Sequence, residues 1–71
     1  MSRYLIIIEE TSTGFSAYSP DLPGCIATAA TLQEVEQEMT SAIEFHLEGL
    51  HASGEDIPKP RSHAAYCDVP A

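Results

Sequence analysis

A chain of 71 residues forms one small domain, and a core of this size gains support from oligomerisation or from a bound partner. Its formal charge of −8, from 11 acidic residues against 3 Lys and Arg, argues against direct binding to nucleic acids or anionic membranes, which need cations at the contact. Two cysteines are too few for a disulfide scaffold, and neither a signal-peptide pattern nor an apolar run of about 20 residues is present, so we expect a cytoplasmic protein.

The first part of the chain predicts three strands. Residues 3–10 form an Ile- and Leu-rich run with apolar side chains on both faces, which is typical of a two-sided strand. A polar turn at 11–14 ends in glycine and leads to a second short strand at 15–19. Two prolines fix a rigid bend at 20–24, after which residues 25–29 form a third strand. Because the connections are short, the three strands are expected to form an antiparallel meander.

The middle of the chain predicts one long helix that lies on this sheet. Thr31 and Glu34 have the spacing of a capping box at its N-terminus, and Gly54 stops it just after Ala52 or Ser53. At about 100° per residue, the apolar side chains fall on one stripe that can face the sheet. This stripe consists of Leu32, Val35, Met39, Ile43, His46 and Leu50, with Ala42 and Leu47 at its edges.

The last part of the chain predicts a connector and one more strand. Prolines make residues 55–60 extended, and residues 63–69 are expected to form a fourth strand with apolar residues on one side. If that strand pairs in parallel with the first, the helix is the crossover connection that a parallel pair requires. We therefore predict an α+β fold of the order β-β-β-α-β. It forms a single domain over 1–71, with 3–58 as the core and 59–71 as the connector and last strand.

Two regions of the sequence resemble a known family. Residues 15–25, which read Phe-Ser-Ala-Tyr-Ser-Pro-Asp-Leu-Pro-Gly-Cys, closely match the strand, bend and strand of the HicB-like antitoxins. The helix end at 42–50 and the exit at 54–58 resemble the corresponding part of the same family. The resemblance covers residues 3–60 and implies a partial ribonuclease-H-like domain.

The resemblance also implies a function in a toxin–antitoxin system. A HicB-like protein neutralises a small basic HicA-type toxin, which has a double-stranded-RNA-binding-like fold and cleaves mRNA with a histidine. Only residues 61–71 follow Pro60, so the chain resembles the short form of the family, without the C-terminal DNA-binding domain that many members carry. Ala29-Ala30 stands where a Gly-Asp pair is usual, and Val35 where alanine is common. These departures leave open a second hypothesis, an orphan oligomeric interaction module with no toxin partner.

We predict no catalytic activity, no metal and no cofactor for this chain. A ribonuclease-H-like active site needs carboxylates that converge on two metal ions, but the first strand offers only Glu9 and Glu10, at its end. A small hydrolase is therefore the least favoured hypothesis. His46 and His51 lie about 140° apart around the helix and cannot easily share a zinc ion. We expect His46 to be partly buried and hydrogen-bonded, and Cys25 to be a small buried hydrophobe.

Acidic side chains and the proline bend are the candidate contacts with a basic toxin. An acidic surface can mask a basic RNA-cleaving one, since complementary charge steers association, although the acids could equally be an ordinary solvated surface. The candidates are Asp21 and Leu22, expected to be exposed on the bend, and the acids Glu9, Glu10, Glu34, Glu36 and Glu38. The bend also has a purely structural interpretation, in which it only shapes the corner. The structural residues, helix caps included, are then Pro20, Pro23, Gly24, Cys25, Thr31 and Gly54.

Phe45 is the one large apolar residue of the helix that lies well off the stripe, about 120–140° from its centre and beside Ser41, Glu38 and Gly49. A single exposed aromatic side chain is common on protein surfaces and needs no functional explanation. The alternative hypothesis is that Phe45, Ser41 and Gly49 form a second contact face, used for self-association into a homodimer or a larger homo-oligomer.

Overall fold

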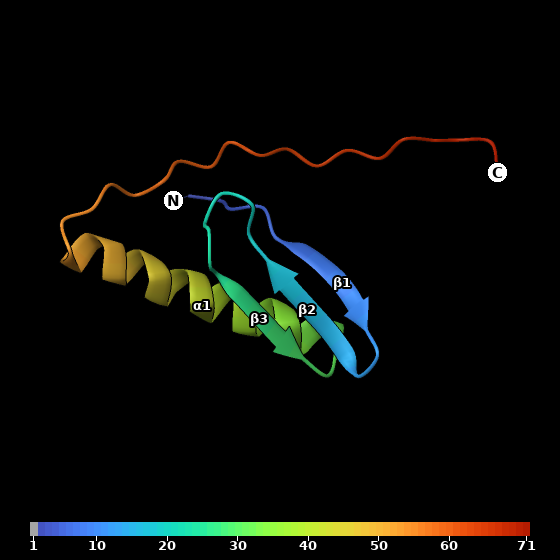
Figure 1. The fold of residues 1–71 in the computed structure, drawn as a ribbon, viewed down its shortest axis with the longest axis horizontal. Helices are drawn as coiled ribbons and strands as arrows, with labels where there is room; N and C mark the ends of the chain where they lie inside the picture. Colours follow the sequence, from blue (N-terminus) through green and yellow to red (C-terminus); the bar gives the residue numbers. More distant parts are fainter. Residues whose placement is uncertain (1) are drawn as a thin grey trace.

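The computed structural model describes residues 2–71 and has three strands followed by one long helix (Figure 1). Strand β1 spans Ile7–Thr11, β2 spans Gly14–Tyr18, β3 spans Ile26–Ala29 and helix α1 spans Leu32–Ala52. The strands form one layer and α1 lies across one of its faces. The predicted α+β fold, an antiparallel three-stranded meander with one long helix packed on it, is confirmed.

The sheet has the order β1-β2-β3, with β2 in the centre. Strands β2 and β3 lie within one residue of their predicted ranges, but β1 begins four residues later than predicted. The reason is that Ile7 pairs with Tyr18, the last residue of β2, so the residues before Ile7 have no strand beside them. They are held instead by a hydrogen bond of 2.9 Å from Ser19 Oγ to the Leu5 carbonyl oxygen.

The β1–β2 hairpin packs closely against the end of β3. Gly14 follows the two-residue turn and pairs with Thr11. A Cβ atom at Gly14 would lie 2.3 Å from the carbonyl oxygen of Ala29, so only glycine fits this approach. The contact places the hairpin, the end of β3 and the start of α1 at the same end of the molecule (Figure 1).

The bend between β2 and β3 inserts a leucine into the core. The Leu22 amide donates to the Ser19 carbonyl oxygen at 3.2 Å, and the Cys25 amide donates to the Leu22 carbonyl oxygen at 3.1 Å. Gly24 has a φ of 82°, which favours glycine. The prediction that Leu22 is exposed is wrong, because its side chain is fully buried. Burial of a leucine side chain stabilises the folded state by about 1.5–3 kcal/mol, and this stabilisation would be lost if the side chain were exposed to solvent.

Helix α1 is capped at both ends. Thr31 Oγ1 accepts a hydrogen bond of 3.1 Å from the Glu34 amide and donates one of 2.9 Å to the Glu34 carboxylate, as the spacing of these two residues predicted. At the other end, the Gly54 amide donates to the His51 carbonyl oxygen and the Glu55 amide to that of Leu50. These bonds satisfy backbone groups that a helix end leaves without partners.

The core lies between α1 and the sheet. Its buried apolar members are Ala17, Leu22, Cys25, Val35 and Met39. The helix packs mainly against β2 and β3, while Tyr4, Ile6 and Ile8, before and within β1, are only partly buried. The predicted stripe is correct except at Leu32, which is 49% exposed because it is the first residue of α1, beside the ends of the strands.

The predicted fourth strand is absent from residues 54–71, where the described chain forms no strand. Just before the predicted range, the amides of Arg61 and Ser62 both donate to the Asp21 carboxylate at 3.1 Å. This contact holds residues 61–62 beside the bend, and the residues that follow extend away from the sheet without pairing with β1 (Figure 1).

Candidate functional site

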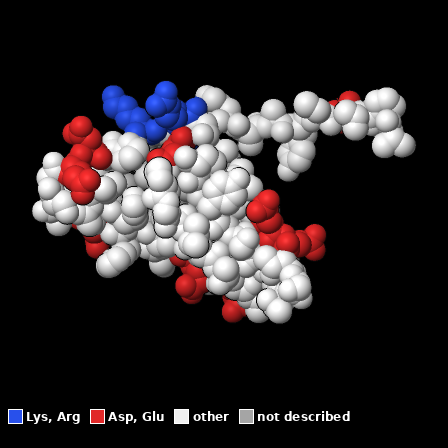
Figure 2. All heavy atoms as spheres, viewed as in Figure 1, with Lys and Arg blue, Asp and Glu red and all other residues white. Residues whose placement is uncertain are grey.

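The acids predicted to bind a partner lie where the β1–β2 hairpin meets the start of α1. All of them are exposed, and we call this region the acidic end: Glu9, Glu10, Glu34, Glu36 and Glu38. Figure 2 shows acidic atoms along this part of the surface, on the side of β1 and below it. Five carboxylates within one end of a small domain give a strongly negative local potential.

The acidic end presents its carboxylates on more than one face. Glu9 pairs with Ser16 and Glu10 with Phe15, so the two glutamates point to opposite sides of the sheet. Glu10 lies on the side of α1, as does Phe15, which packs against the core. On the helix, Glu36 lies about 160° away from its acidic neighbours two residues before and after it. This arrangement suits a partner that wraps around the end of the domain better than it suits a small ligand.

The three Lys and Arg side chains lie elsewhere, in a single group beside the connector (Figure 2). Arg3 lines a hollow there together with Ser62, and Lys59 and Arg61 line the next one together with Asp21. No lysine or arginine therefore stands among the acids of the acidic end.

Asp21 is half-buried and its carboxylate is engaged within the chain. It accepts hydrogen bonds from the Arg61 and Ser62 amides, and from Ser62 Oγ at 2.8 Å. The hydrogen bond from the Arg61 amide is the main cause that lowers the pKa of Asp21, with smaller contributions from Ser62 and from the Arg61 charge. Asp21 therefore has a structural role, because its carboxylate holds the connector against the bend. No local sequence pattern indicates this contact, since its partners lie 40 and 41 residues further along the chain.

Neither residue of the bend is free in the way that was predicted for partner binding. Leu22 is buried and Asp21 has its carboxylate oxygens occupied by the connector. In this conformation Leu22 is out of a partner's reach, while Asp21 is only half-buried. The fully exposed candidates are the acids of the acidic end.

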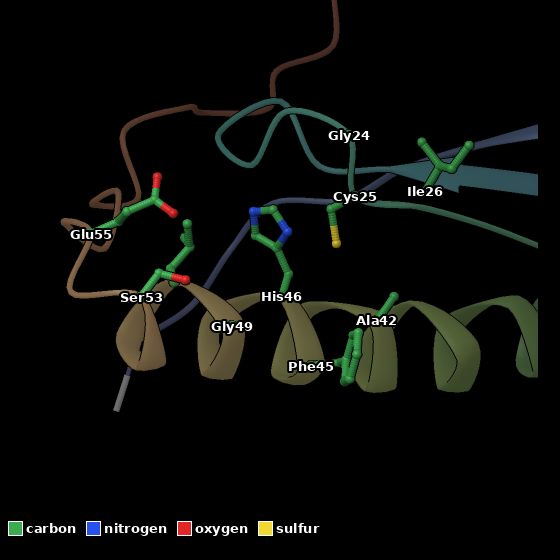
Figure 3. Close-up of a pocket in the computed structure, with 10 residues that line it drawn as sticks. Gly24, Cys25, Ile26, Ala42, Phe45, His46, Gly49, Ser53 and Glu55 are labelled. Carbon is green, nitrogen blue, oxygen red and sulfur yellow. The ribbon is translucent and has the colours of Figure 1, made fainter.

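A groove of about 430 Å³ runs between α1 and the chain at the start of β3 (Figure 3). His46 extends from the helix into this groove and faces Cys25 across it. Burial raises the pKa of the Cys25 thiol, so the sulfur stays protonated and is a poor nucleophile at neutral pH. Cys25 is buried, as predicted, and His46 is half-buried. The pair lines a groove and has no thiolate to carry out covalent chemistry.

Phe45 lies at the rim of the same groove and is 79% exposed. Unlike His46, it does not extend across the groove toward Cys25 (Figure 3). Ser41 and Gly49, one turn before and after it, are exposed as well. The exposure predicted from the helical spacing is thus present, whereas its use as a contact face remains a prediction.

Within residues 2–71, no three or more His, Cys, Asp and Glu side chains come together in a way that could hold a metal ion. In the same range, α1 is not apolar enough to cross a bilayer.

The sequence and the fold match known proteins over nearly the whole chain. The model of the HicB_like antitoxin of bacterial toxin-antitoxin systems matches residues 4–71. An uncharacterised 14.9 kDa protein from the rep-hol intergenic region of Haemophilus phage HP1 is 36% identical over 67 residues. That match covers 94% of this chain but 50% of the phage protein, so the chain spans half the length of this relative.

Two further proteins match this chain over most of its length at similar sequence identity. The UPF0150 protein ssr1765 of Synechocystis sp. is 37% identical over 58 residues, which cover 80% of this chain and 73% of that protein. Among solved structures, a chain of a HicA3 and HicB3 toxin-antitoxin complex superposes with a TM-score of 0.73 at 32% identity, covering 84% of this chain and 70% of that one. On the match over residues 4–71 and this shared fold, the chain belongs to the HicB-like antitoxin family of bacterial toxin–antitoxin systems.

Proposed function

We propose that this chain is an antitoxin-type binding protein that neutralises a small basic HicA-like mRNA-cleaving toxin by masking its active site. The observation that carries the proposal is the structural likeness to a chain of a HicA3 and HicB3 toxin-antitoxin complex, together with the family match over residues 4–71. The proposal places the protein in the cytoplasm, where such a toxin meets its mRNA. It includes self-association into a homodimer or a larger assembly.

The charge distribution supports the binding of a basic partner. The chain has a formal charge of −8, and the acidic end exposes five carboxylates with no lysine or arginine among them. A toxin that binds RNA must present cations to the phosphates, and these cations are complementary to an acidic surface. Such complementarity speeds encounter and fixes orientation more than it adds affinity.

The role that we propose is binding without catalysis. Two-metal hydrolysis needs carboxylates that meet at a single point. On β1 the carboxylates of Glu9 and Glu10 point to opposite faces of the sheet. The Cys25 thiol, which faces His46 across the groove, has its pKa raised by burial. These features favour a protein whose surface, and not a reactive centre, performs the function.

The test is co-purification followed by an activity assay. The tagged protein is expressed from its native locus, and the mass and stoichiometry of the proteins that bind to it are measured. We expect one small basic protein at a stoichiometric ratio. Purified on its own, that protein should cleave mRNA, and adding this chain should stop the cleavage. A bound protein without ribonuclease activity, or cleavage that continues in the complex, would contradict the proposal.

The second candidate is an orphan interaction module of the same fold. It is favoured by Ala29-Ala30, which stands at the strand-to-helix turn where the resemblance leads one to expect Gly-Asp. The same co-purification distinguishes the two, because an orphan module would bring down only further copies of itself. Incubation of the purified chain with RNA and Mn²⁺ addresses the remaining hydrolase hypothesis, and we expect no cleavage.

A further inference from the structure

The face of the sheet opposite α1 carries a row of apolar side chains. Strand pairing places Ile7, Tyr18 and Ile26 directly beside one another across β1, β2 and β3, and we call these three residues the apolar row. Their neighbours Ala17 and Ala27 point toward α1 and pack in or against the core, so the row points the opposite way. Tyr18 is 41% exposed and Ile26 is 68% exposed. Adjacent exposed apolar side chains of this kind mark interaction surfaces more often than isolated ones do.

The apolar row belongs to a face that has a charged border. Glu9 follows Ile7 by two residues and therefore lies on the same face, where it pairs with Ser16. In Figure 2, where the strands lie in front of α1 as in Figure 1, acidic atoms lie along the border of this face and its middle carries no charge. Lysine and arginine atoms lie along one edge. An apolar centre within a polar border is the composition that protein–protein interfaces share.

We propose that this face of the sheet binds the basic toxin, with Tyr18 and Ile26 at the centre of the contact and Glu9 at its border. The inference rests on the proposed function and names the surface that performs it. A central tyrosine supplies a large apolar area with few rotatable bonds, and its hydroxyl can hydrogen-bond to the partner. Ile26 is the first residue of β3, an edge strand, so a partner can approach its side chain from the side as well as from above.

The charges of the chain favour a basic toxin over a second copy as the occupant. Two copies packed through their apolar rows would bring two acidic borders together, on chains that each carry a formal charge of −8. A basic protein meets opposite charge at the same border. The edge with lysine and arginine repels such a partner, and this restricts the orientations in which it can dock. The acids then steer the encounter, while the apolar row provides affinity.

The first test is the affinity of an Ile26→Lys variant for the small basic protein that co-purifies with the chain, measured by calorimetric titration. Lysine is tolerated on an exposed edge strand, but here it places a cation at the centre of a contact with a basic partner. We expect the dissociation constant to rise by about 30-fold or more, mainly through faster dissociation. The matched control is Ile57→Lys, the same change at an exposed isoleucine that lies beside Leu47 and Glu48 of α1. It should leave the affinity unchanged.

Two further measurements separate loss of binding from loss of folding. Urea unfolding of both lysine variants shows whether each retains the fold. Hydroxyl-radical footprinting needs no substitution at all, because it compares the oxidation of each aromatic side chain in the isolated chain and in the complex. On binding of the basic protein, the oxidation of Tyr18 should fall, whereas that of Phe45 on α1, which is 79% exposed, should stay the same.

Unchanged affinity of the Ile26→Lys variant, or protection of Phe45 in place of Tyr18, would overturn the inference and leave toxin neutralisation standing, since the cleavage assay measures that separately. An isolated chain whose molar mass in solution is halved by Ile26→Lys would assign the face to a second copy, and would equally overturn it. The absence of any basic protein from the co-purification would overturn this inference and the proposed function together, and it would be known before any variant is made.

Discussion

The carboxylate of Asp21 accepts two hydrogen bonds from Ser62, one from its amide and one from its hydroxyl at 2.8 Å, although the two residues are 41 positions apart. The contact joins the bend before β3 to the connector after α1. It stands in place of the strand pairing that the end of the chain was predicted to make.

Replacing Asp21 with asparagine should lower stability at neutral pH. The hydrogen bonds lower the pKa of Asp21 from its ordinary value of 3.8, so ionisation of this group stabilises the folded state above that pH. The contribution is lost as the pH falls through the depressed pKa of the folded state. Urea unfolding of both proteins should therefore show a difference at pH 7 that shrinks below pH 3.8. Asp68→Asn, in the exposed tail, is the control and should leave the midpoint unchanged at both pH values.

Leu22→Ala should be strongly destabilising, in contrast to what a residue on a surface bend would show. Leu22 is fully buried, so its truncation leaves a cavity and should cost about 2–5 kcal/mol of unfolding free energy. Leu32→Ala makes the same chemical change at a side chain that is 49% exposed, and should cost about 0.5 kcal/mol or less. Urea titration followed by circular dichroism measures both. Equal costs at the two sites would contradict the burial of the bend.

Two Gly→Ala substitutions should have opposite signs. At Gly14 a Cβ would lie 2.3 Å from the Ala29 carbonyl oxygen, so alanine should cost more than about 1 kcal/mol. At Gly49 nothing lies within 4 Å, and alanine in the helix interior should add about 1 kcal/mol. Thermal unfolding of dilute protein gives the comparison. A stabilising Gly14→Ala would refute the close approach of the hairpin to β3.

The two cysteines should differ in reactivity. Cys25 is buried, with its pKa raised by burial, whereas Cys67 is exposed. In native protein at pH 8, an alkylating reagent should modify Cys67 rapidly and Cys25 only at the rate at which the fold opens. Mass spectrometry of the peptides follows each site, and the same labelling in urea shows that both thiols are able to react.

If the acidic end steers a basic toxin, the association rate should fall when its charge is removed. Combined Glu9→Gln, Glu10→Gln and Glu38→Gln substitutions should slow association by about tenfold and weaken its dependence on salt. The control removes the same charge elsewhere, at Glu44, Glu48 and Glu55. Stopped-flow or surface-based kinetics with the co-purified partner gives both rates, and an equal loss in the two variants would indicate that only net charge matters.

Much of the fold follows from local sequence signals. The capping pair Thr31 and Glu34 and the apolar spacing located α1 to within a residue, because both features act within one or two helical turns. The exposure of Phe45 followed from the same geometry. Helical spacing is reliable here because the helix has a regular period and one sheet to face.

The errors come from contacts between distant parts of the chain. Leu22 sits among prolines and an aspartate, a setting that indicates a surface bend, yet its side chain is buried in the core cluster that also contains Val35 and Met39 of α1. The alternating pattern at 63–69 resembles a strand, but the Asp21 carboxylate holds the preceding residues beside the bend, and residues 63–69 pair with no strand. Which of the adjacent Glu9 and Glu10 lies on the side of α1 likewise depends on the pairing of β1 with β2, which places Glu10 opposite Phe15.

Helix α1 packs over β2 and β3 and leaves β1 less covered, so local opening of the fold should begin at β1. Strand β1 is bonded to a single neighbour, and Tyr4, Ile6 and Ile8 on and before it are only partly covered. Its amides should therefore exchange with solvent deuterium through low-energy local openings, while those of β2 exchange only when the whole domain unfolds. Strand β1 is then the element whose amides would gain the most protection from exchange if a partner covered it.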